Sequence, residues 1–94
     1  MQLEIITPES QIFKGDVESV QFPGLEGSFQ VLKGHAPIIS ALRDGDVKVK
    51  LVAALDEQEE FHTSVRKEGG NVIMVTIKGG VVEMLNDNII LLAE

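Results

Sequence analysis

The side chains that could do chemistry are few, and they do not fall in a familiar catalytic spacing. A nucleophilic triad can be assembled from Ser40, His35 and Asp44, in which the histidine would take the proton of the serine hydroxyl. Ser40 lacks the Gly-x-Ser-x-Gly turn that exposes a nucleophile, and no oxyanion-binding feature accompanies it. We therefore predict no catalytic residues, and a small hydrolase is the weakest of the function classes.

Ion and phosphate sites have equally little support. A metal site would need His35 and His62 together with carboxylates, but the chain has no His-x-His or His-x-x-x-His spacing. The acidic run at residues 56–60 lacks the Asp-x-Asp-x-Asp-Gly spacing of a calcium loop, and the Lys-Gly-Gly run at 78–80 is too short for a phosphate loop. The prediction is no metal, no nucleotide site and no cofactor.

Residues 26–37 are the stretch that hydrophobic alternation does not explain. A Pro-Gly turn ending at Gly24 precedes it, Gly27 and Gly34 permit backbone angles closed to other residues, and Pro37 directs the residue before it away from a helix. The pattern predicts one fixed, non-repetitive loop. Such a loop is either a plain connection between strands or a contact surface.

The rest of the chain reads as short strands, because apolar and polar residues alternate. The expected strands span residues 2–7, 11–22, 38–42, 47–51, 61–65, 72–77, 81–85 and 89–92. In the second of these the apolar parity changes between Val17 and Val20, which predicts a β-bulge there or a break at Gly15. Lysines alternate along 47–51, which favours an edge strand, whereas 72–77 is apolar on both faces, as in an interior strand.

The fold class follows from these elements. Residues 51–60 combine helical spacing with an acidic run, and we interpret them as a strand end followed by an acidic turn. With eight or nine short strands and no clear helix, the chain is predicted to be all-β. We expect a single β-sandwich domain over residues 1–94, with about eight to ten short strands in two sheets.

Composition narrows the choice of partners. Lysine and arginine number 8 against 15 acids, for a formal net charge of −7, so a nucleic acid is not an expected partner. Cysteine is absent, which excludes disulfides and thiolate metal sites. No apolar run is long enough to span a bilayer, so direct membrane insertion is not expected. A binding or structural role is favoured.

Four segments together resemble one family. The run Gly24-Leu25-Glu26-Gly27 followed by Gly34-His35-Ala36-Pro37 resembles the PG-x-EG-x-x-G-x-x-PGHAP motif of the epsilon subunit of F-type ATP synthases, which is called delta in mitochondria. Residues 1–9, 79–84 and 88–94 are similar to the same family, in the same order. The resemblance covers most of the chain.

The chain also departs from that family in places. Gln30 stands where the family usually has glycine, Lys33 where it usually has proline, and residues 51–70 are longer than the usual pattern. Family members usually continue into two C-terminal helices, whereas this sequence stops at Glu94. We therefore expect either a member without the helical hairpin or a chain from which the hairpin has been removed.

The resemblance implies a function and a site. The function is that of a non-catalytic central-stalk (rotor) subunit that couples the gamma shaft to the membrane c-ring during proton-driven ATP synthesis. The implied partners are the gamma subunit and the polar loops of the c-ring, at the cytoplasmic face of the bacterial inner membrane. The residues implied to face the ring are Ser28, Phe29, Gln30 and His35, on a loop shaped by Gly24, Gly27, Gly34 and Pro37. A generic β-sandwich protein-interaction module is the alternative.

Overall fold

A computed structural model describes residues 1–56 and 58–94, and the regular structure of these residues is entirely β-strand. The nine strands are β1 (Gln2–Ile6), β2 (Gln11–Gly24), β3 (Gly27–Leu32), β4 (Ile38–Leu42), β5 (Gly45–Leu51), β6 (Val65–Gly69), β7 (Val72–Ile77), β8 (Gly80–Leu85) and β9 (Asn88–Ala93).

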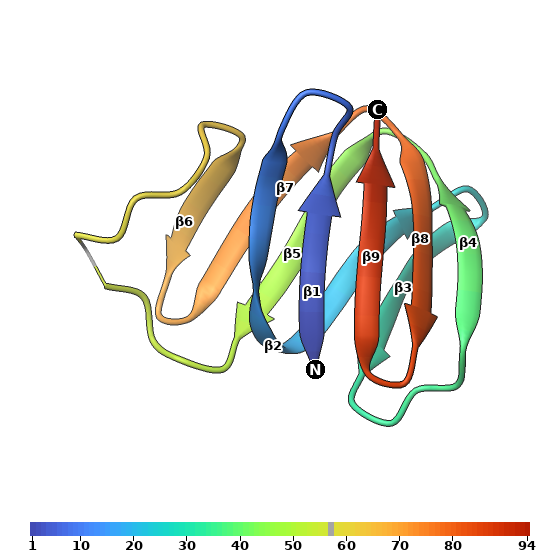
Figure 1. Cartoon of the computed structure of the whole chain (residues 1–94), viewed down its shortest axis with the longest axis horizontal. Coiled ribbons are helices and arrows are strands. Elements are labelled where there is room, and N and C mark those ends of the chain that lie inside the picture. Colours follow the sequence, from blue (N-terminus) through green and yellow to red (C-terminus); the bar gives the residue numbers. More distant parts are fainter. Residues whose placement is uncertain (57) are drawn as a thin grey trace.

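The longest strand, β2, belongs to both layers of the fold (Figure 1). Its first part, from Gln11 to Asp16, pairs with β1, and its second part pairs with β5 and β3. The register with β5 shifts between Val17 and Ser19, which confirms the predicted bulge, and β2 passes through Gly15 without a break. A bulge bends and twists a strand, so β2 can cross from one layer to the other.

The two layers are parts of one continuous hydrogen-bonded sheet. One layer contains β1, β9, β8 and β4, and the other contains β3, the second part of β2, β5, β7 and β6 (Figure 1). β1 lies parallel to β9, with Gln2 opposite Asn88, and the end of β2 pairs with β4 through Gly24 and Leu42. The strands β1, β9, β8, β4 and β2 thus form a closed ring of hydrogen-bonded neighbours. The predicted all-β sandwich is confirmed, with its two sheets joined through β2.

One apolar core fills the space between the layers, and alternate positions of the strands supply it. In β9, for example, Ile89, Leu91 and Ala93 are buried while Ile90 and Leu92 are exposed. Most of the core is valine, isoleucine and leucine, as the scarcity of aromatic residues requires. Phe22 is its largest fully buried side chain.

The prediction of an edge strand at 47–51 is wrong. This segment lies in β5, which pairs with β2 on one side and β7 on the other. Lys48 and Lys50 project to solvent from the face of the layer, and Lys50 Nζ lies 3.6 Å from Glu18 Oε2 on the neighbouring strand. Alternation shows which face is wet, but it does not show how many neighbours a strand has. The interior position predicted for 72–77 is confirmed, because β7 pairs with β5 and β6.

The strand predicted at 61–65 is also wrong, since only Val65 lies in a strand. The observed strand is β6, which pairs with β7 alone among the described residues and carries Arg66, Lys67 and Glu68. Charged side chains are common on edge strands because they discourage pairing with other chains. The predicted strand end at Leu51 is confirmed, while the acidic turn that follows includes residue 57, which lies outside the described residues.

Candidate functional site

The four residues predicted to face a partner do not share one loop. The expected loop at 26–37 is interrupted by β3, which pairs with β2 along its whole length. Ser28 lies near the start of β3 and His35 lies beyond its end, so the strand, at about 3.3 Å per residue, separates them. The sequence signal for this strand is alternation, because the inward Phe29 and Val31 alternate with exposed residues.

Phe29 supports the core and is not presented to solvent like its neighbours. Its ring is half-buried and lies against Phe22, with 5.6 Å between ring centroids and 36° between planes. Gly24 leaves room for it, because a Cβ at Gly24 would lie 3.0 Å from the Phe29 ring and 2.6 Å from the Gly27 carbonyl oxygen. Ser28 and Gln30 are exposed. Of the three predicted β3 residues, only these two have fully exposed side chains.

Phe29→Asp is therefore expected to lower the free energy of unfolding by about 2 kcal/mol, because it removes apolar contact with Phe22 and brings a carboxylate to the edge of the core. Urea unfolding followed by circular dichroism measures this loss. Ser28→Asp, one residue away on the exposed face, serves as the control and is expected to change stability by less than about 0.5 kcal/mol. Equal stability of the two variants would show that Phe29 is a surface residue.

The loop at 33–37 is fixed to the turn between β8 and β9. Gly34 has a φ of 83° and its N–H donates to Asp87 Oδ1 at 3.1 Å. The Asp87 carbonyl in turn accepts a hydrogen bond from Gln2 N at 2.9 Å. Gly27 has a φ of 132°, and Pro37 directly precedes β4, so the predicted shaping roles at these positions agree with the backbone.

The side chains considered for catalysis are not brought together. Ser40 Oγ donates to its neighbour's carbonyl, Ala41 O, at 3.3 Å, and the His35 ring bonds to Ala36 O. Within residues 1–56 and 58–94, no group of three or more histidine, aspartate or glutamate side chains could hold a metal ion. The Lys-Gly-Gly run at 78–80 leads directly into β8.

β8 lies between β4 and β9 in one layer (Figure 1), and the outward side of these three strands carries a group of exposed apolar side chains. These strands already bury their inner side chains in the core, and their outward positions are also mostly apolar. Val81 lies opposite Leu92, and Ile39 and Ile90 flank Glu83 from both sides. We call this surface the outer apolar face; its residues are Ile39, Val81, Leu85, Ile90 and Leu92, which are 43% to 75% exposed. An apolar patch of this kind typically marks an interaction site.

Sequence analysis missed this face, although a signal for it exists. Residues 89–92 are an unbroken apolar run, whereas a strand with one wet side would alternate. From the sequence alone, this run is predicted only as a strand.

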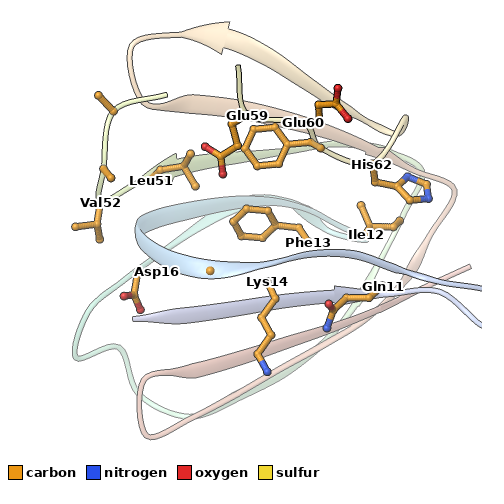
Figure 2. A pocket seen from close by; sticks show the side chains of 14 residues that line it. Gln11, Ile12, Phe13, Lys14, Asp16, Leu51, Val52, Glu59, Glu60 and His62 are labelled. Carbon is orange, nitrogen blue, oxygen red and sulfur yellow. The ribbon is translucent and has the colours of Figure 1, made fainter. Parts of the chain in front are cut away.

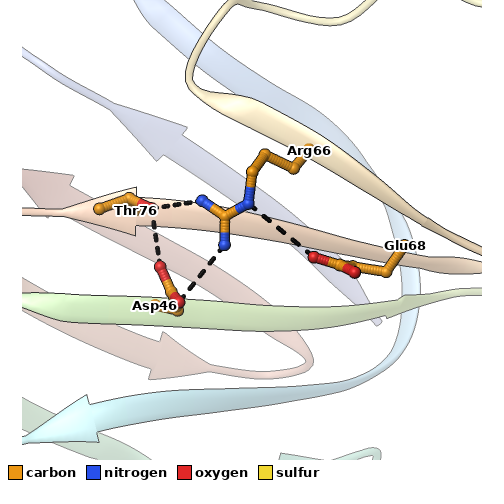
Figure 3. A network of polar contacts seen from close by, with 4 residues as sticks. All are labelled: Asp46, Arg66, Glu68 and Thr76. Atoms are coloured by element: carbon orange, nitrogen blue, oxygen red, sulfur yellow. Dashed lines mark hydrogen bonds and ion pairs between the residues drawn. The ribbon is translucent and has the colours of Figure 1, made fainter.

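A network of polar contacts on the opposite layer joins three strands (Figure 3). Arg66 Nη1 donates to Thr76 Oγ1 at 2.6 Å, and Thr76 Oγ1 donates to Asp46 Oδ1 at 2.7 Å. The Arg66 guanidinium also lies 3.3 Å from Asp46 Oδ2 and 3.8 Å from Glu68 Oε1. The Thr76 hydrogen bond is the main cause that holds the pKa of Asp46 below its ordinary value of 3.8. Desolvation opposes it, and the charge and hydrogen bond of Arg66 add to the lowering.

This lowered pKa gives the network a pH dependence. A carboxyl whose folded pKa is depressed stabilises the fold above its unfolded pKa, and that contribution is lost as the pH falls through the folded pKa. The free energy of unfolding is thus expected to fall on acidification below about pH 4, less steeply in Asp46→Asn than in the wild type. Urea titrations at a series of acidic pH values measure the two slopes, and Thr76→Val should show an intermediate one. Identical slopes in all three proteins would contradict the role of the network.

Comparison with known proteins places the chain in a family. Residues 1–64 match the family model described as ATP synthase, delta/epsilon chain, beta-sandwich domain. The chain belongs to this family. A relative named ATP synthase epsilon chain, from Chlorobium limicola, is 38% identical over 93 residues, which is 99% of this chain and 88% of the relative. A second, from Salinibacter ruber, is 35% identical over all of this chain but only 58% of its own length.

Chains in two solved structures of ATP synthase assemblies share the fold. A chain of the Euglena gracilis mitochondrial ATP synthase matches with a TM-score of 0.72 at 20% identity, over 97% of this chain and 48% of its own length. A chain of the Tetrahymena thermophila central stalk and c-ring matches with a TM-score of 0.68 at 14% identity, over 99% of this chain and 62% of its own length. Among the described residues of this family member, no helix is long and apolar enough to cross a bilayer.

Proposed function

We propose that this chain is a non-catalytic subunit of the ATP synthase rotor, where it couples the gamma shaft to the membrane c-ring during proton-driven ATP synthesis. Its family and the names of its relatives support this role. In such an assembly the chain is a peripheral component at the cytoplasmic face of the bacterial inner membrane.

The outer apolar face is the observation that carries the proposal, and we assign it to the gamma subunit. A rotor subunit must stay attached to its shaft through every turn, and permanent interfaces are more apolar than transient ones. Leu92 and Leu85 are each more than half exposed in the isolated chain, so a partner that covers them gains free energy from each. The inward side chains of the same strands pack in the core and hold the strands in place, so the interface is largely preformed.

We assign the contact with the c-ring to the end of the fold where β2 turns into β3. Ser28 and Gln30 are exposed polar residues close to that turn, and they suit the polar loops of a membrane ring. Phe29 holds them in place through its contact with Phe22. His35 lies at the other end of β3 and falls outside this contact.

Titration calorimetry of the chain against the gamma subunit of the same organism tests the role. The expected result is stoichiometric binding with a negative heat-capacity change, because apolar surface is buried. Absence of binding to gamma, both alone and in the assembled enzyme, would overturn the proposal.

Cysteine cross-linking tests the ring contact separately, because the chain contains no cysteine of its own. In the assembled complex, Ser28→Cys is expected to form a disulfide with a cysteine placed in the polar loop of the c subunit, and His35→Cys is not. A cross-link from position 35 but not from 28 would mean that the opposite end faces the ring.

A further inference from the structure

Within the segment between β5 and β6, residues 52–54 and 59–62 line a cavity of about 480 Å³ together with the first part of β2 (Figure 2). We call this segment, residues 52–56 and 58–64, the strap. The ring of Phe61 in the strap lies 6.2 Å from the ring of Phe13 in β2, centroid to centroid. His62 lies at one end of the cavity beside Gln11 and Ile12, while Asp16 and Val52 lie at the other (Figure 2).

His62 connects the strap to the turn between β1 and β2. Its Nε2 lies 3.3 Å from Ser10 Oγ, and its Nδ1 lies 3.1 Å from the backbone nitrogen of Ser64. A backbone N–H can only donate, so Nδ1 must accept and carries no proton. In the neutral ring the proton is therefore on Nε2, which donates to Ser10 Oγ.

His35 has the opposite arrangement. Its Nδ1 lies 2.6 Å from the carbonyl oxygen of Ala36, which can only accept, so this Nδ1 carries the proton. Adding a second proton at Nε2 leaves that bond intact. Of the two histidines in the chain, only His62 has a hydrogen bond that a proton must break.

We propose that protonation of His62 is a switch that releases residues 60–64 of the strap and opens the cavity over Phe13. A proton on Nδ1 would face the Ser64 N–H, so two donors would meet where a hydrogen bond had been. The loop would have to turn away, and Phe61 would lose its place against Phe13.

The rest of the strap has anchors that do not involve the imidazole. Leu55 N donates to Gly70 O at 2.8 Å, and Val52 N donates to Asp16 O at 3.3 Å. Lys67 Nζ donates to the carbonyl oxygens of Asp56 and Glu59. The opening is therefore local, with a hinge between these anchors and His62.

The elements around the cavity carry several charged groups. They are Glu9 in the β1–β2 turn, Lys14 and Asp16 in β2, Glu59 and Glu60 in the strap, and Lys67 in β6. In Figure 2 the Lys14 side chain points away from the cavity. Among the described residues, the His62 ring forms hydrogen bonds with the Ser10 hydroxyl and the Ser64 amide, so the proton changes a hydrogen bond and not an ion pair.

Hydrogen exchange of the Ser64 amide, with the imidazole ¹⁵N shifts of the same labelled chain, tests the switch from about pH 8 to about pH 5. After correction for intrinsic exchange, the protection of Ser64 is expected to fall about tenfold or more as His62 becomes protonated. At the high-pH end, His62 should show a bare Nδ1 and His35 a protonated one.

His62→Asn is the matched variant, because the asparagine Oδ1 takes the place of Nδ1 as an acceptor and does not titrate. Its Ser64 protection is expected to be flat with pH, whereas His35→Asn should behave as the wild type. Protection that is independent of pH in the wild type, or that falls equally in His62→Asn, would overturn the proposal. So would a protonated Nδ1 on His62 at high pH, a result that does not depend on any variant.

Discussion

Leu92→Asp is expected to weaken binding of the gamma subunit by about 100-fold or more, while the chain keeps its fold. Leu92 lies on the outer apolar face near the end of β9, opposite Val81 of β8 on one side and Ile6 of β1 on the other. In the complex, the new carboxylate would be removed from water without a positive partner on this face, which costs far more than the lost apolar contact alone. Calorimetric titration with gamma measures the change in Kd.

Val52→Asp is the matched control for this experiment. Val52 is 56% exposed and Leu92 is 57% exposed, so the two changes place a similar charge on similarly wet sites. Val52 lies at the start of the strap, away from the outer apolar face, and its replacement should leave the affinity for gamma unchanged. Equal weakening by both variants would indicate a general charge effect, and no weakening by either would place gamma elsewhere on the molecule.

Phe22→Ala is expected to lower the free energy of unfolding by about 3–5 kcal/mol. Phe22 is fully buried, and its removal leaves a cavity beneath Phe29 that the surrounding strands cannot close. A domain of this size has a total stability of about 5–15 kcal/mol, so the variant would be close to unfolding at ordinary temperature. Urea unfolding measures the loss.

The control is Leu32→Ala in the neighbouring strand β3. Leu32 is 53% exposed, so the same truncation there should cost less than about 0.5 kcal/mol. A loss at Phe22 no larger than that at Leu32 would mean that the core is not organised around this ring.

Local features of the fold were predictable where a residue type allows only one physical explanation. The bulge in β2 follows from the parity change after Val17, and positive φ at Gly27 and Gly34 follows from the lack of a Cβ. Pairing was not predictable from such local signals. β5 and an edge strand show the same alternation, because the number of neighbours is decided by segments far away in the sequence.

The site was less predictable than the fold for a similar reason. Ser28 and His35 are close in sequence, yet β3 separates them, and Phe29 faces inward because Phe22 lies beneath it. The sequence does not distinguish the roles of the two histidines. Their difference lies in whether Nδ1 meets a carbonyl or an amide, and this depends on the backbone path of single turns.

The parallel pairing of β1 and β9 has a mechanical consequence. The chain enters at one end of β1 and leaves at the opposite end of β9, and the two strands are in register from Gln2 and Asn88 to Ile6 and Leu92 (Figure 1). A force that pulls the two termini apart therefore slides these strands past each other and loads all the hydrogen bonds between them at once. An antiparallel pair pulled from one end would instead open bond by bond. Stretched between its termini, the domain should resist as a single unit, a property that would suit the rotor role proposed above.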